Sequence, residues 1–173
     1  MSKSTKKVLP GFTEKDFWKV IEGAWAKFPV VNKMRLNLDD YGSNTLAEME
    51  VILKYFVLPE IKKTLYGLDK EALAIFHQLS YIRAKQLDRW DVHCYASFSH
   101  KNTFFLEVGA FIVAMGQDFY ELIYSPKKAR IKSYNYRPPV DCYDLIRLPN
   151  HVYEEKYNND ISEVKTIYDE DDQ

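Results

Sequence analysis

Apolar residues recur at helical spacing near the start of the chain. The members of this face are Phe17, Ile21, Ala24, Trp25 and Phe28. Steps of three and four residues place them on one side of a helix. Thr13 stands just before the pattern and Asp16 follows it by three residues, the arrangement of a capping box. The sequence therefore predicts a first helix that begins after Thr13 and ends before Pro29.

A second helical pattern follows a stretch without any period. Residues 30–42 contain Asn, Asp and Gly but no sustained repeat, so we expect a connection there with at most a short element. The next apolar face consists of Leu46, Met49, Leu53 and Phe56. It predicts a helix over residues 45–55. Pro59 either ends this helix or lies in the first turn of the next one.

A broader apolar stripe begins after Asp69, a residue type that is favoured as a helix N-cap. The stripe consists of Leu73, Phe76, Ser80, Ala84 and Leu87, widened by Ile75, Leu79 and Ile82. Its width indicates that this long third helix has contacts on two sides. Residues 90–98 follow almost without a break and fit a short helix.

The most apolar segment of the chain, residues 104–115, predicts a buried core helix. It contains Glu107 and is well short of the roughly 20 residues that a membrane-spanning helix needs. Gly116 marks a kink or an end, after which a second short helix can follow. Pro126 stops that run. We expect no membrane association from this segment.

These patterns predict a mainly α fold: a single-domain multi-helix array around an aromatic-rich core, with little or no sheet. The chain has 173 residues, of which 46% are hydrophobic and 15% aromatic, enough for one core. We expect a flexible N-terminus over residues 1–11 and a helical domain over residues 12–152. Residues 153–173 form an acidic C-terminal tail, with eight acidic residues against two lysines.

The overall charge and the cysteines restrict the class of protein further. The 24 basic and 25 acidic residues nearly balance, which excludes a polyanion binder of the histone kind. Cys94 and Cys142 are too few for a disulfide framework and suit a reducing compartment. The N-terminus is basic but lacks the apolar run of a signal peptide. We therefore expect a cytoplasmic protein.

A candidate catalytic pair lies at Asp91 and His93, beside Trp90. A carboxylate near an imidazole can orient the imidazole or shift its pKa, so that it acts as a general acid or base. The alternative is a helix junction in which Asp91 is only an N-cap. Because no nucleophile or glycine elbow accompanies the pair, we favour the junction.

A metal site is a weaker hypothesis. His93, Cys94 and His100, together with His77, could supply nitrogen and sulfur ligands. Their spacings match no zinc signature, since structural sites usually show ligands in pairs two to four residues apart. A buried thiol and surface imidazoles explain the same residues. We expect neither a metal nor another cofactor.

Basic and aromatic residues alternate in an arm between the last two predicted helices. They are Lys127, Lys128, Arg130, Lys132, Tyr134, Tyr136 and Arg137. Such residues can neutralise phosphates and stack on unpaired bases, which makes nucleic acid a candidate partner. The simpler interpretation is a solvated loop, which can also rest against the acidic tail.

The order of several aromatic and glycine positions resembles a known family. The matching residues are Phe17 and Trp18, Leu73 and Phe76, Trp90 and Asp91, Phe104 and Phe105, and then Gly116, Phe119, Tyr120 and Pro126. Over roughly residues 12–130 the chain resembles the uncharacterised bacterial family known as domain of unknown function number 4240. That family often has an arginine where this chain has Leu106, Glu107 and Val108, so no role of that arginine carries over. The resemblance implies a mainly helical bacterial cytoplasmic domain and no particular chemistry.

The supply of aromatic residues favours protein binding as the function. The chain has 13 Tyr, 10 Phe and 3 Trp, more than its core obviously needs. Tyr and Trp are preferred interface anchors. We expect a non-enzymatic protein-binding domain, of an immunity or antitoxin-like kind, with an unidentified protein partner. The alternatives are a small hydrolase-type enzyme using Asp91 and His93, and nucleic-acid binding through the basic arm.

Overall fold

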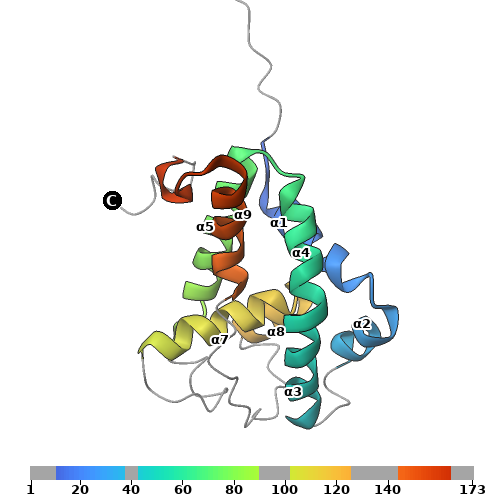
Figure 1. Cartoon of the computed structure of the whole chain (residues 1–173). Helices are drawn as coiled ribbons and strands as arrows, with labels where there is room; N and C mark the ends of the chain where they lie inside the picture. The colour runs from blue at the N-terminus through green and yellow to red at the C-terminus, as the bar shows by residue number, and fades with distance from the viewer. Residues whose placement is uncertain (1–10, 38–42, 90–101, 126–143, 165–173) are drawn as a thin grey trace, which may run out of the picture.

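Helices account for all the regular structure in the part of the chain that the structure describes. The computed structural model describes residues 11–37, 43–89, 102–125 and 144–164, and no strand occurs within these ranges (Figure 1). Large rings such as Phe17, Trp25 and Phe76 are fully buried in one core. The predicted mainly α array around an aromatic-rich core is confirmed. None of the helices in these ranges is both long and apolar enough to cross a bilayer.

The first helix, α1 (Glu14–Trp25), begins as the sequence predicts. The Thr13 hydroxyl accepts a hydrogen bond from the Asp16 amide at 3.3 Å, and the Thr13 amide donates to the Asp16 carboxylate at 3.1 Å. This reciprocal pair is the expected capping box. After a turn, Pro29 opens the short helix α2 (Pro29–Leu36), where the sequence predicted a connection with at most a short element.

One continuous helical rod follows, made of α3 (Ser43–Ile52), the π-helical turn η2 (Leu53–Val57) and α4 (Leu58–Tyr66). Proline at position 59 has no amide hydrogen, and its ring would clash with the carbonyl four residues earlier in a regular α-helix. The widened turn accommodates it, and the Leu58 amide donates to the Leu53 carbonyl, five residues back. Pro59 therefore lies in the first turn of α4 without breaking the rod.

The central helix is α5 (Lys70–Lys85), which packs against α7 (Asn102–Ala114) on one side and α9 (Asp144–Tyr157) on another. The side chain of Asp69 caps α5 by accepting from the Ala72 amide at 2.8 Å. Both the predicted cap and the predicted two-sided packing are confirmed. In Figure 1, α4 and α9 stand beside each other, and α7 runs across their lower ends.

A glycine ends the core helix α7, as the sequence suggested. Gly116 has a φ of 99°, in the region that favours glycine, and it precedes the short helix α8 (Gln117–Tyr124). The apolar α7 lies close to α5. The backbone of Gly109 approaches the Ala84 carbonyl so closely that a side chain at position 109 would overlap it.

The last described elements reach into the acidic end of the chain. Helix α9 continues to Tyr157, and the 3-10 turn η4 (Ile161–Glu163) also packs on α5 and α9. Tyr153 and Ile161 are buried in the core. Their apolar area anchors this segment despite its many acidic residues.

Candidate functional site

The predicted catalytic pair and basic arm lie outside the described residues. Trp90, Asp91 and His93 fall within residues 90–101, and residues 126–143 contain the arm. The arm residues concerned are Lys127, Lys128, Arg130, Lys132, Tyr134, Tyr136 and Arg137. The enzyme and nucleic-acid hypotheses built on them stay predictions.

Only one of the four candidate metal ligands, His77, belongs to the described part of the chain. Within that part, no group of three or more His, Cys, Asp or Glu side chains is placed to hold a metal ion. His77 lies in α5, the helix against which η4 packs. Its partial burial lowers the pKa of the imidazole below the usual 6.5, while the nearby charge of Asp160 acts in the opposite direction.

The lowered pKa of His77 predicts a pH-dependent stability. At pH values between the lowered folded-state pKa and 6.5, the His77 imidazole is protonated in the unfolded chain but mostly neutral in the folded chain. The contribution of His77 to the free energy of unfolding is therefore fully present above about pH 6.5, and it decreases as the pH falls. Urea unfolding at about pH 7.5 and about pH 5.5 should show a smaller loss of stability for His77→Gln than for the wild type. Equal losses in the two proteins would show that His77 does not titrate in this way.

Among the charged residues that the structure describes, Arg35 of α2 is the most deeply buried, at 3% exposed. Its Nη1 and Nη2 atoms donate to the two oxygens of Glu22, at 3.2 and 2.5 Å. Nη1 also donates to the Met115 carbonyl, and Nε and Nη2 both donate to Asn32. The guanidinium lies over the ring of Trp25, 5.0 Å from its centroid. All five N–H groups of the guanidinium have acceptors. We call this cluster the joint, because it connects α2 to α1 and to the end of α7.

The same joint determines the start of α8. Glu22 accepts a hydrogen bond from the Gln117 amide at 2.9 Å, which places a carboxylate at the N-terminus of α8. A side-chain carbon at Gly116 would lie 2.0 Å from Nη1 of Arg35. The glycine is therefore required both for its backbone conformation and for the space that Arg35 occupies.

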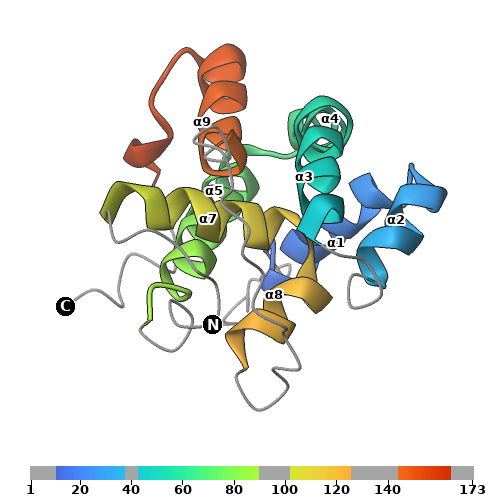
Figure 2. The same cartoon turned by 90° about the horizontal axis from the view of Figure 1, so that it is seen from below.

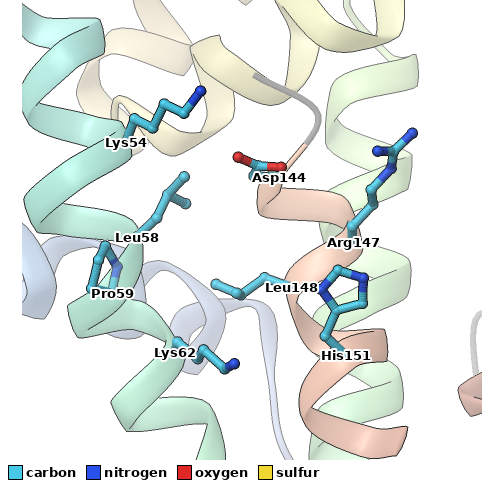
Figure 3. Close-up of a pocket in the computed structure, with 8 residues that line it drawn as sticks. All are labelled: Lys54, Leu58, Pro59, Lys62, Asp144, Arg147, Leu148 and His151. Carbon is cyan, nitrogen blue, oxygen red and sulfur yellow. The ribbon is translucent and has the colours of Figure 1, made fainter. Parts of the chain in front are cut away.

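A groove of about 260 Å³ lies between the rod and α9. Figure 3 shows its lining, which consists of Lys54, Leu58, Pro59, Lys62, Asp144, Arg147, Leu148 and His151. Leu58 and Leu148 point toward each other from the two helices and form an apolar floor. The positions on α9 recur at steps of three and four residues, so they share one helical face.

Charged groups stand at both ends of this groove. Lys54, Asp144 and Arg147 lie at one end, and Lys62 lies at the other with His151 nearer to it (Figure 3). Lys62 forms an ion pair with Glu155 at 3.0 Å. The lining therefore contains three permanent cations and one carboxylate, in a protein whose total formal charge is −1.

A second surface feature is an exposed set of large apolar side chains on α2, α3 and η2. We call this set the apolar face, and it consists of Val30, Leu36, Val51, Tyr55 and Phe56. Each is between 51% and 75% exposed. The Phe28 and Phe56 rings meet edge to face at 6.0 Å, which joins the start of α2 to η2. In Figure 2, α2 lies on the side of the molecule away from α9, and α3 stands between them.

The π-helical turn positions the aromatic residues of this face. Leu53 and Val57 are buried on the inner side of the turn, whereas the adjacent Tyr55 and Phe56 are both more than half exposed. Turns of this kind are rare and occur frequently at functional sites. The same turn therefore supplies Lys54 to the groove and two rings to the apolar face.

Sequence reasoning missed both surfaces. The spacing of Leu46, Met49, Leu53 and Phe56 predicted one buried helical face, but Phe56 is 52% exposed because η2 changes the helical period. The signal available was Pro59, because a proline disfavours a regular α-helical turn before it. The groove joins residues about 90 positions apart, so no local pattern indicates it.

Comparisons with known proteins leave the chain without a match: none was found among protein-family models, curated proteins or solved structures. The resemblance to the uncharacterised bacterial family stays a prediction from the sequence.

Proposed function

We propose that this chain is a non-enzymatic protein-binding domain and that the apolar face is its contact surface. The observation that carries the proposal is the concentration of exposed apolar side chains in one segment of the chain, which forms α2, α3 and η2. Of the eight large hydrophobic residues exposed in the described ranges, five lie between residues 30 and 56. Exposed apolar surface that is concentrated in this way is typical of interaction sites, whereas scattered single residues are not.

The residue types on the apolar face suit a partner interface. Tyr55 is 64% exposed, and its ring packs only loosely beside Lys54, whose Nζ lies 5.9 Å from the ring centroid. Aromatic rings of this kind become the strongest contributors to affinity when a partner covers them. Val30 and Val51 are stiff β-branched side chains, so little rotamer freedom is lost when they are buried.

The buried polar cluster around Arg35 supports a structural role. The buried charge of Arg35 has acceptors for all its donors, and Glu22 is engaged at the start of α8. In contrast, the exposed side chains of the apolar face would stabilise a complex, because a partner that covers them removes their apolar surface from water. A stoichiometric complex, such as an immunity or antitoxin-like protein forms with its target, is the arrangement that we propose.

A crosslinking experiment identifies the partner. A photoreactive phenylalanine analogue replaces Tyr55 in one variant and Tyr81 of α5 in the other. Both variants are expressed in the host cell and irradiated there. Tyr81 is a matched control, because it is 40% exposed and also lies beside a lysine, with Lys85 Nζ 5.9 Å from its ring. Position 55 should yield one predominant protein adduct that position 81 does not.

The affinity of the captured protein then tests the proposal. The purified partner should bind the wild-type chain with fixed stoichiometry. Tyr55→Ala should raise the Kd of this complex about 30-fold, as expected for an interface anchor of about 2 kcal/mol. Tyr81→Ala should leave the Kd unchanged within about twofold. Equal effects of both variants, or adducts common to both positions, would contradict the proposed contact surface.

A further inference from the structure

We propose that the protein partner of the apolar face places a carboxylate against Lys33 of α2, between the groups that cover Val30 and Leu36. The proposal rests on the proposed function, because it names the chemistry of the surface that covers the apolar face. It concerns the helix that supplies two of the five exposed side chains.

Lys33 lies at the centre of the exposed side of α2. Val30 is 75% exposed and Leu36 is 51% exposed, and Lys33 stands three residues from each of them. Steps of three residues place these side chains along one side of a helix, with Lys33 between the other two. Arg35, on the opposite side of α2, is buried in the joint. A partner that covers both Val30 and Leu36 therefore meets Lys33 as well.

The amine of Lys33 makes a purely apolar partner surface unfavourable. Lys33 is exposed, and its amine forms no hydrogen bond or ion pair within the part of the chain that the structure describes. Water therefore solvates this charge in the free protein. Apolar groups that covered it would remove the water and leave a charge without an acceptor. A carboxylate replaces the lost water with a charge-assisted hydrogen bond.

The charges around this position have the sign that a carboxylate requires. Lys27, in the turn before α2, is a second exposed lysine, and neither α2 nor this turn contains an acidic residue. Glu22 already matches the charge of Arg35. Glu48, an exposed acidic residue of α3, forms no ion pair with either lysine. The described part of this helix therefore offers positive charge, which favours an acidic partner surface and speeds its association.

Lys33→Met tests the charge, because the two kinds of partner surface predict effects of different sign. The partner captured at position 55 is purified, and its Kd is measured for the wild type and for the variant. Methionine keeps an unbranched side chain but removes the amine, so the partner's carboxylate loses its counter-ion and the Kd should rise about tenfold. A purely apolar surface would bind Lys33→Met as tightly as the wild type or more tightly, because no amine has to lose its water.

Lys15 of α1 supplies the matched control. It is also an exposed lysine without a hydrogen bond or ion pair in the described ranges, and it lies outside the apolar face. Lys15→Met should leave the Kd unchanged within about twofold. The urea midpoints of the two variants confirm that both are folded.

Carbodiimide crosslinking of the purified complex locates the carboxylate. This reagent joins an amine to a carboxylate in direct contact with it, so peptide mapping should find Lys33 coupled to one Asp or Glu of the partner, and Lys15 not coupled. Replacing that partner residue by its amide should raise the Kd of the wild-type chain about tenfold. The same replacement should cause little further loss with Lys33→Met, because the two changes remove one interaction.

The proposal is overturned if Lys33→Met binds the partner at least as tightly as the wild type, or if no carboxylate is coupled to Lys33. Tyr55→Ala separates this result from the proposed function. If Tyr55→Ala weakens binding and Lys33→Met does not, the contact surface stands and only the carboxylate is wrong. If position 55 captures no partner, or if Tyr55→Ala binds as the wild type does, the proposed function fails and the carboxylate fails with it.

Discussion

Replacing Gly109 with alanine is expected to lower the free energy of unfolding by about 2–3 kcal/mol, although alanine is the better helix former. The new methyl carbon would lie 2.6 Å from the carbonyl oxygen of Ala84 and 3.0 Å from its Cα atom. Those atoms belong to the backbone of α5, so relief requires that the central helix and α7 move apart. Urea unfolding monitored by circular dichroism measures the change.

A second glycine provides the matched control for this experiment. Gly23 lies within α1, and a side-chain carbon there would meet no atom within 4 Å other than those of its chain neighbours and of the adjoining helix backbone. Gly23→Ala should therefore stabilise the protein by about 0.5–1 kcal/mol, because it reduces the freedom of the unfolded chain without a clash. If both variants changed stability in the same direction, the close crossing of α5 and α7 would not be the cause.

Replacing Arg35 with methionine is expected to lower the free energy of unfolding by about 3 kcal/mol. The variant keeps an unbranched side chain of similar length but removes five donors. The Met115 carbonyl and the amide oxygen of Asn32 lose their Arg35 hydrogen bonds, and the carboxylate of Glu22 loses its counter-ion. The estimate is at the low end for a broken ion pair because Glu22 is 37% exposed.

The controls for this variant use the same helix. Lys33 is an exposed residue of α2, and Lys33→Met should change stability by less than about 0.5 kcal/mol. Arg35→Lys keeps the charge but not the two-pronged geometry, so its stability should fall between those of the wild type and Arg35→Met. Thermal unfolding of the four proteins at one pH gives the order. A full recovery of stability by lysine would show that charge alone matters at this joint.

Local chemistry explains which parts of the fold the sequence could predict. The Thr13 and Asp69 caps involve partners only three residues away, so a short stretch of sequence contains the whole interaction. The end of α7 at Gly116 is likewise local, since it depends on one backbone angle. The broad stripe on α5 predicted contacts on two sides because helical spacing alone shows which side chains share a face.

Features that depend on distant residues could not be predicted in the same way. Arg35 and Glu22 lie 13 residues apart on different helices, and the Met115 carbonyl that Arg35 also binds is 80 residues away. The groove requires α4 and α9 to be neighbours, which no periodicity indicates. The exposure of Phe56 depends on the extra residue of a π turn, which changes the helical period that the sequence pattern assumed.

The measurement that tests the proposed contact surface most directly is a methyl spectrum of the chain, labelled at valine and leucine, with and without the protein captured at position 55. The account predicts that the signals of Val30, Leu36 and Val51 change at stoichiometric addition, because their exposed methyl groups become covered. Leu58 and Leu148, in the groove, should keep their signals. Changes confined to the groove, or to neither surface, would contradict the claim that the apolar face binds a protein partner.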